Sequence, residues 1–201
     1  MVKKSMLKFE GMFSMAVAAA LLVGAGALLQ FAFSPQSCNE FTGEIAESGL
    51  PDQQKAGVVK QFVDAAVAKA SNKDVPELQL FDELTKEKSS LGGYLIGYQT
   101  ETEGPTKIGT LVLHGVSTVD FCDASHPQCN DSKKTEVGKD LYNFKTVDGV
   151  HEVQLWISVA AQGGGWIAYY WKDPQGKMTP KYVYVKGVPS RNLLLASGYF
   201  A

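Results

Sequence analysis

The sequence has no excess of basic residues, because 19 lysines and arginines stand against 21 aspartates and glutamates, with a formal net charge of -2. Proteins that bind nucleic acid usually carry a basic face, so this balance argues against nucleic acid as a partner. The chain also lacks a phosphate-binding loop. Its three consecutive glycines, Gly163 to Gly165, follow a stretch of helical spacing and end that helix instead of opening one.

Catalytic and metal-binding patterns are absent as well. No nucleophile with a neighbouring base, no pair of carboxylates and no group of metal ligands has a spacing beyond chance. We therefore expect a protein that is not an enzyme and that needs no metal or cofactor.

Cysteine is scarce, with three residues in 201. Cys122 and Cys129 bracket a short polar loop, and outside the cytoplasm they can oxidise. A disulfide there is predicted to contribute roughly 2–3 kcal/mol by restraining the loop. Zinc is the alternative, but His126 lies between the two cysteines at a spacing unlike that of a closed four-ligand site. The third cysteine, Cys38, then either pairs with a partner chain or stays a free thiol.

One long hydrophobic run stands out at the start of the chain. Residues 12–33 contain no charged side chain. A helix of this length rises about 33 Å, which matches a hydrocarbon core of about 30 Å. Because Lys3, Lys4 and Lys8 precede the run, we expect a cytoplasmic N-terminus and a single-pass anchor in the lipid of a bacterial inner membrane, with the domain in the periplasm.

Two alternatives for this run stay open. Ala25-Gly26-Ala27 resembles a cleavage site, in which case the run is a signal peptide and the domain is secreted. The small residues around Gly24 and Gly26 also permit close approach of another helix in lipid. The chain would then be an accessory or structural subunit, with membrane-protein partners bound through its N-terminal helix, for example in a respiratory or photosynthetic complex.

Residues 1–33 are thus interpreted as the anchor, 34–49 as a linker and 50–201 as one domain. Helical spacing follows Pro51, where Val59, Val63, Ala66 and Ala70 share a stripe. A second, shorter helix is expected after Pro76, with Leu78, Phe81 and Leu84 as its apolar residues. A third is expected after Asp148-Gly149, with Val153, Trp156, Ile157 and Ala160 on one face.

Five strands are predicted. Residues 94–100 and 108–114 form a hairpin around Glu103-Gly104-Pro105, and residues 166–171, 181–186 and 193–199 form an antiparallel meander. We expect the preceding helices to cover one face of this sheet.

The C-terminal residues contain an ordered series of short motifs. Glycine, tryptophan and tyrosine open one strand, a Pro-Gln-Gly-Lys turn follows, and a Ser-Gly-Tyr sequence lies in the last strand. The positions are Gly165-Trp166, Tyr169, Trp171, 174–177, Pro180-Lys181, 184–186, Val188-Pro189 and 197–199. This series resembles the single Cache domain of bacterial receptors. Upstream the resemblance is looser, and it covers about residues 50–201.

This resemblance implies an α+β fold: a PAS-like domain with a long N-terminal helix and a five-stranded antiparallel sheet, here after a transmembrane helix. It also implies an extracytoplasmic site for a small organic acid or amino acid. Thr102-Glu103-Gly104-Pro105 replaces the usual Asp-x-Asn-Gly turn, so the pocket is expected to differ. Family receptors continue into a second membrane helix and a signalling module after the last strand, so we expect no signalling output from this chain itself.

Four residues are the candidates for ligand contact. Side chains alternate along a strand, so Tyr169 and Trp171 share a face, and Lys181 offers a charge for a carboxylate. Tyr98 is a weaker candidate and His114 weaker still. In the competing interpretation, the aromatic residues only pack the core and Lys181 reaches solvent.

Overall fold

The computed structural model describes residues 42–115, 137–146 and 149–201. The chain has two compact units, Met1–Pro35 and Gln36–Ala201, and every described residue belongs to the second. The predicted anchor at residues 12–33, Cys38 and the predicted Cys122–Cys129 disulfide all lie outside the described residues. In the described ranges, no helix combines the length and apolar character needed to cross a membrane.

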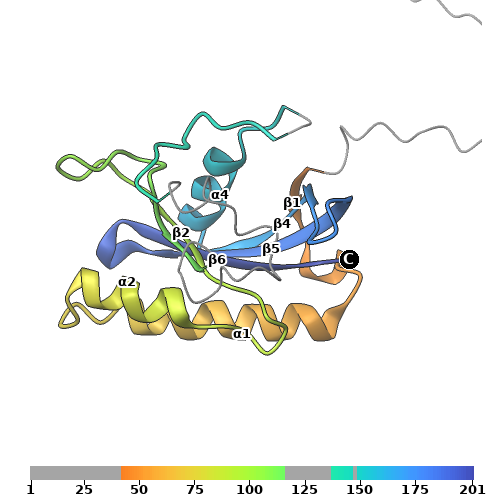
Figure 1. Cartoon of the computed structure of the whole chain (residues 1–201), viewed down its shortest axis with the longest axis horizontal. Helices are drawn as coiled ribbons and strands as arrows, with labels where there is room; N and C mark the ends of the chain where they lie inside the picture. Colours follow the sequence, from red (N-terminus) through yellow and green to blue (C-terminus); the bar gives the residue numbers. More distant parts are fainter. Residues whose placement is uncertain (1–41, 116–136, 147–148) are drawn as a thin grey trace, which may run out of the picture. The chain divides into compact units, whose positions relative to one another are not determined.

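An antiparallel sheet of six strands forms the centre of the domain, in the order β1-β4-β5-β6-β2-β3 (Figure 1). The predicted hairpin is present as β2–β3 and the predicted meander as β4–β5–β6, so the α+β class is confirmed. The strands are β1 (Gly43–Ile45), β2 (Ile96–Gln99), β3 (Leu111–His114), β4 (Gly165–Lys172), β5 (Met178–Val188) and β6 (Leu193–Phe200).

The prediction of five strands was wrong by one, because β1 adds an edge strand. It pairs antiparallel with β4, with Gly43 opposite Ala168 and Ile45 opposite Trp166. A strand of three residues is too short to show an alternating pattern, and its conformation is fixed by the partner strand instead. It lies inside the range 34–49 that the sequence suggested as a linker, so the sheet begins earlier in the chain than expected.

Within the described ranges, three α-helices accompany the sheet: α1 (Gln53–Ala70), α2 (Glu77–Lys86) and α4 (Glu152–Ala161). Short 3-10 helices lie at Glu47–Gly49 and Pro189–Arg191. Asp52 caps the start of α1, because its carboxylate accepts a hydrogen bond from the Lys55 amide at 2.9 Å. At its other end, the Arg191 guanidinium donates to the carbonyls of Ala70, Asn72 and Val75 at 2.6–2.7 Å. This arginine therefore ties the α1–α2 connection to the β5–β6 turn.

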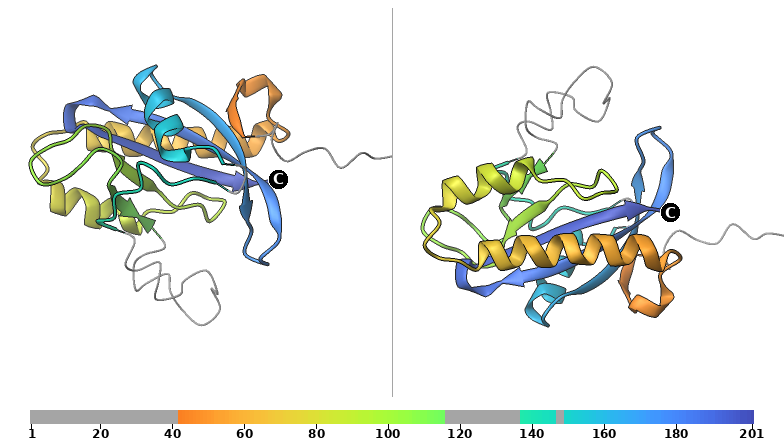
Figure 2. Two further views of the ribbon diagram at one scale, coloured as in Figure 1. Left: turned by 90° about the horizontal axis from the view of Figure 1, so that it is seen from above. Right: turned by 90° about the horizontal axis from the view of Figure 1, so that it is seen from below.

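Helices cover both faces of the sheet, whereas we expected them on one. Figures 1 and 2 show α1 and α2 below the long strands and α4 above them. On the α1 side Trp166 and Ala168 join one buried cluster, and on the α4 side Ile167 and Tyr169 join another. The predicted alternation along β4 is thus confirmed. Since both sets of alternating side chains are apolar, both faces need a covering layer.

The apolar stripe of α2 also differs from the prediction at one residue. Leu78 is 86% exposed, whereas Leu80 and Leu84 are fully buried. These two leucines are four positions apart, so they lie one above the other on the side of α2 that meets the core. Phe81 is partly buried against the same cluster, as predicted.

Candidate ligand-binding site

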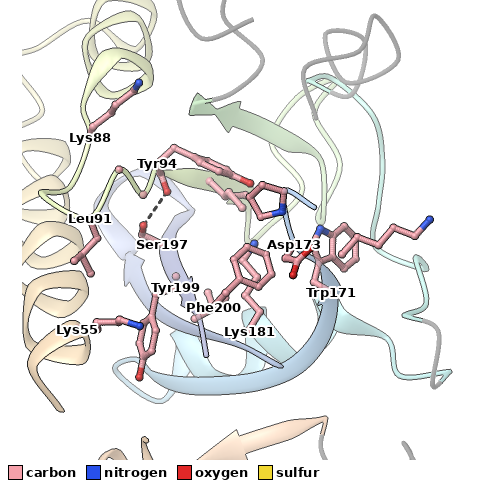
Figure 3. A pocket seen from close by; sticks show the side chains of 17 residues that line it. Lys55, Lys88, Leu91, Tyr94, Trp171, Asp173, Lys181, Ser197, Tyr199 and Phe200 are labelled. Carbon is pink, nitrogen blue, oxygen red and sulfur yellow. Dashed lines mark hydrogen bonds between the residues drawn. The ribbon is translucent and has the colours of Figure 1, made fainter. Parts of the chain in front are cut away.

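The last residues of β6 border a cavity. β6 pairs with β2 only through residues 193–196, so among the described strands 197–200 have a neighbour on the β5 side alone. The chain that leads into β2 passes beside this open edge, and the Ser197 hydroxyl donates to the Tyr94 carbonyl at 2.8 Å. A cavity of about 400 Å³ lies here, which is large enough for a small metabolite (Figure 3).

The walls come from the first turn of α1, the segment before β2 with the first residue of β2, the end of β4 with the β4–β5 turn, β5 and β6. In Figure 3, Lys55 and Tyr199 lie together on one side of the cavity, and Trp171 and Asp173 lie together on another. The lining residues are Lys55, Lys88, Leu91–Tyr94, Ile96, Trp171–Pro174, Lys181, Val183 and Ser197–Phe200.

Lys181 is the charged group with the least solvent contact in this lining. It stands on β5 directly opposite Tyr169 of β4 and Phe200 of β6, so the three side chains share one face of the sheet. Its Nζ lies 5.5 Å from the centre of the Phe200 ring and 6.0 Å from that of Tyr169. The Tyr94 ring is 5.9 Å away. With 7% of its surface exposed, Lys181 does not reach solvent, so that part of the competing interpretation was wrong.

The charge of Lys181 is poorly compensated. Burial lowers the pKa of its amine to about 8, and the negative charge of Glu152 opposes this shift only in part. Within the described residues, its Nζ forms no hydrogen bond or ion pair, and three aromatic faces are its close contacts. A buried ammonium at a cavity wall is strongly stabilised by an anion that enters the cavity.

Tyr169 stands between Lys181 and α4. It is 2% exposed, and its pKa is raised well above the ordinary value by burial first and then by the charge of Glu152, to which it also hydrogen-bonds. Glu152 is itself buried at the first position of α4. Together these groups form a polar cluster under α4, adjacent to the amine.

The rim of the cavity adds more positive charge. Four lysines line the cavity against one acid, Asp173. Lys55 lies 5.7 Å from the centre of the Tyr199 ring and 3.7 Å from the Asp52 carboxylate. Burial and the charge of Asp52 raise the pKa of Tyr199 to about 12, so this phenol stays protonated under ordinary conditions. The cavity therefore favours anionic ligands.

Two of the four residues predicted to contact the ligand line the cavity. Trp171 and Lys181 line the cavity, and Tyr169 lies against Lys181 without lining it. Tyr98 lies elsewhere, with its ring 5.6 Å from that of Trp156 under α4. His114 packs its ring 5.0 Å from Tyr94.

Sequence reasoning missed three residues around the amine: Tyr94, Phe200 and Glu152. Phe200 had a usable signal, since it directly follows the last predicted strand, 193–199, and continues its alternation two residues beyond Gly198, opposite Lys181. Tyr94 and Glu152 had none, because each lies just before or at the start of an element whose register is set by tertiary contacts.

Comparison with known proteins supports this description. A family model described as the Cache domain matches residues 126–201. No curated protein matches the chain. The crystal structure of a methyl-accepting chemotaxis protein from Vibrio parahaemolyticus RIMD 2210633 has the same fold, with a TM-score of 0.56 and 20% identity over 77% of this chain and 93% of the other.

Two further solved structures have lower TM-scores. One is described as the basis for carboxylic acid recognition by a Cache chemosensory domain, with a TM-score of 0.45 and 17% identity over 74% of this chain and 87% of the other. Another is the periplasmic sensor domain of a chemotaxis protein, with a TM-score of 0.47 and 16% identity over 74% and 96%. Residues 126–201 thus match the Cache domain model, and the described domain has the fold of the chemotaxis protein.

Proposed function

We propose that this chain is an extracytoplasmic ligand-binding protein that holds a small organic acid or amino acid in the cavity beside β6. Lys181 neutralises the carboxylate of the ligand, and the Trp171 and Phe200 rings contact its apolar part. The Cache family match motivates a sensory role without catalysis, in which occupancy of the cavity is passed on to a partner.

One observation carries the proposal: a buried ammonium faces a cavity of about 400 Å³ and has no anionic partner within hydrogen-bond distance in the described part of the chain. Desolvating a charge without a partner costs several kcal/mol, so an apolar side chain at this position would give a more stable core. A ligand carboxylate supplies the missing partner and recovers part of this cost.

The membrane anchor is part of the same proposal. Its support is the uncharged run at residues 12–33 and the lysines before it, a pattern that favours a domain on the periplasmic side of a bacterial inner membrane. No observation on the described residues favours the accessory-subunit alternative, which stays a prediction from the small residues of that run.

Thermal unfolding of the full chain tests the proposal. A panel of small mono- and dicarboxylates and amino acids is added in turn, and the melting temperature is followed. A ligand at about 100 times its Kd adds about 2.7 kcal/mol to the free energy of unfolding, which is a shift of several degrees. If no member of the panel shifts the melting temperature, the proposal is wrong.

Two variants show whether a shift arises in this cavity. Lys181→Met keeps the unbranched chain but removes the charge, so the shift is expected to vanish. Lys107→Met removes an exposed lysine that is not part of the cavity lining, and the shift is expected to persist. An equal shift in both variants contradicts the assignment of Lys181 as the carboxylate-binding residue.

A further inference from the structure

Lys181 has the surroundings of a nucleophilic amine as well as those of a carboxylate-binding cation. Its Nζ sits among the rings of Tyr94, Tyr169 and Phe200 at 5.5–6.0 Å, and it borders a cavity that a small molecule can enter. Because no hydrogen bond or ion pair engages this nitrogen within the described residues, its lone pair is available whenever the proton leaves. A buried lysine in an apolar pocket is the setting in which proteins form imines with carbonyl compounds.

The protonation state supports this chemistry. Burial lowers the pKa of the Lys181 amine to about 8. About a tenth of the amine is then neutral near neutral pH, compared with well under a thousandth for an exposed lysine. The aromatic faces favour the ammonium form, as does the charge of Glu152, and the lowered pKa already includes the opposition of Glu152.

Imine formation also needs a proton for the departing hydroxyl group. The hydrogen-bonded Tyr169 and Glu152 lie on the side of Lys181 that faces α4, and the Tyr169 ring centre is 6.0 Å from Nζ. We assign this buried pair the role of positioning and protonating the adduct. Glu152 acts here as a positioning residue, because it acts through Tyr169.

We propose that Lys181 captures a small aldehyde or keto acid in the cavity as a reversible imine. The neutral amine attacks the carbonyl carbon and forms a carbinolamine. Its hydroxyl accepts one proton from the acid pair and leaves as water, the nitrogen returns one proton to that pair, and a C=N bond replaces C=O. No oxidant or reductant is needed, and hydrolysis reverses the reaction. The inference rests on the proposed function in one respect, namely that small molecules enter the cavity.

Several titratable groups surround this amine. Glu152 faces it from α4, and Tyr169 and Tyr94 face it from β4 and from the segment before β2. Around the cavity lie further titratable groups: Lys55, Lys88, Lys172, Asp173 and Tyr199. Of these groups, Glu152 is the one whose charge shifts the pKa of Lys181, and it acts against burial.

Reductive trapping tests the inference on the full chain. The protein is incubated with pyruvate and sodium cyanoborohydride near neutral pH, and the modified lysines are mapped by mass spectrometry of peptides. We expect one reduced pyruvate unit on Lys181, at a yield at least about tenfold above that on exposed Lys107, because the Lys181 amine is neutral more often than an ordinary lysine amine. An unmodified Lys181, or a yield equal to that of Lys107, overturns the inference.

Propionate is the matched control ligand, because it has the chain length of pyruvate without the ketone. If both acids raise the melting temperature and no adduct forms on Lys181, the inference fails and the proposed function stands. If an adduct forms while propionate gives no stabilisation, the nucleophilic role stands and carboxylate binding by Lys181 fails. Glu152→Gln removes the charge that favours the ammonium form, which by itself would speed trapping. Because the proton route through the acid pair is lost, we expect trapping at Lys181 to slow several-fold, with the background on Lys107 unchanged. An unchanged rate at Lys181 overturns the role of the acid pair.

Discussion

Lys181 and Tyr169 stand directly opposite each other on β5 and β4, with the ammonium nitrogen 6.0 Å from the centre of the tyrosine ring. The pairing places a charge on the face of the sheet that α4 covers, in a row that also contains Phe200. The aromatic rings attract the ammonium group but do not replace a hydrogen-bond acceptor. A carboxylate that accepts its hydrogen bonds is therefore expected to stabilise it further.

This arrangement predicts a stability that depends on pH. The folded pKa of Lys181 is about 8 and the ordinary value is 10.5, so the unfolded chain binds more protons between these values. The free energy of unfolding should therefore rise with pH from about 8 to about 10.5, and the cost of the charge, about 3 kcal/mol, is fully present below that range. Tyr169 and Tyr199, whose pKa values are raised, act in the opposite direction above about pH 10.

Comparison with Lys181→Met isolates the contribution of the lysine. Denaturant unfolding of both proteins is measured across this pH range, and the difference cancels the effect of the tyrosines. The variant should be the more stable near neutral pH, and the difference should shrink as pH rises. A difference that does not change with pH contradicts the assignment of a lowered pKa to Lys181.

Gly198 is predicted to tolerate no side chain. A Cβ at this position would lie 2.5 Å from the Tyr182 carbonyl oxygen and 2.7 Å from Val183 Cγ2. Gly198→Ala should therefore lower the free energy of unfolding by about 1–3 kcal/mol in a denaturant titration. Gly43→Ala is the matched strand control, because no atom lies within 4 Å of a Cβ there. Equal effects of the two substitutions would show that the contact at Gly198 does not constrain β6.

Arg191 should be one of the strongest polar contributors to stability. Its guanidinium donates three hydrogen bonds to carbonyls at the end of α1 and in the following turn. Arg191→Ala leaves these carbonyls without their charged donor, and a loss of about 2–3 kcal/mol is expected in urea unfolding. Arg191→Lys should recover only a part of this loss, because an ammonium cannot reproduce the planar fork. Full recovery by lysine would show that charge alone matters.

The two leucines at the start of α2 provide a test of its orientation. Leu80→Ala removes a fully buried side chain and should cost about 2–5 kcal/mol. Leu78→Ala changes a side chain that is 86% exposed, so its effect should stay within about 0.5 kcal/mol. Thermal or urea unfolding of the two variants distinguishes them, and a larger loss for Leu78 would contradict the observed stripe.

Much of the fold could be predicted because local patterns agreed with the tertiary structure. The stripe of Val59, Val63 and Ala66 identified α1, and turn residues around Pro174 and Pro189 separated the three strands of the meander. β1 could not be predicted, since three residues acquire a strand conformation only from pairing with β4. Leu78 was misplaced because a short helix has several nearly equivalent apolar stripes.

The site was predicted less completely than the fold. Lys181 and Trp171 were found from strand alternation within the motif that resembles Cache domains, and both line the cavity. Gly93 and Tyr94 form a wall of the cavity because β2 pairs with β6 only through residues 193–196. This pairing joins segments that are far apart in the sequence, so local patterns do not predict it. Glu152 joins the cluster through the docking of α4, and sequence spacing carries no information about that contact.

The most direct test of the account is the pH dependence of ligand affinity, measured by titration calorimetry with a carboxylate that stabilises the full chain. If the Lys181 ammonium binds the carboxylate, the affinity should fall by about 30-fold between about pH 7 and about pH 9.5, as the amine of the free protein loses its proton. Lys181→Met should bind weakly at both pH values. An affinity that is constant over this range, or unaffected by the substitution, would contradict the central claim that a buried lysine charge selects the ligand.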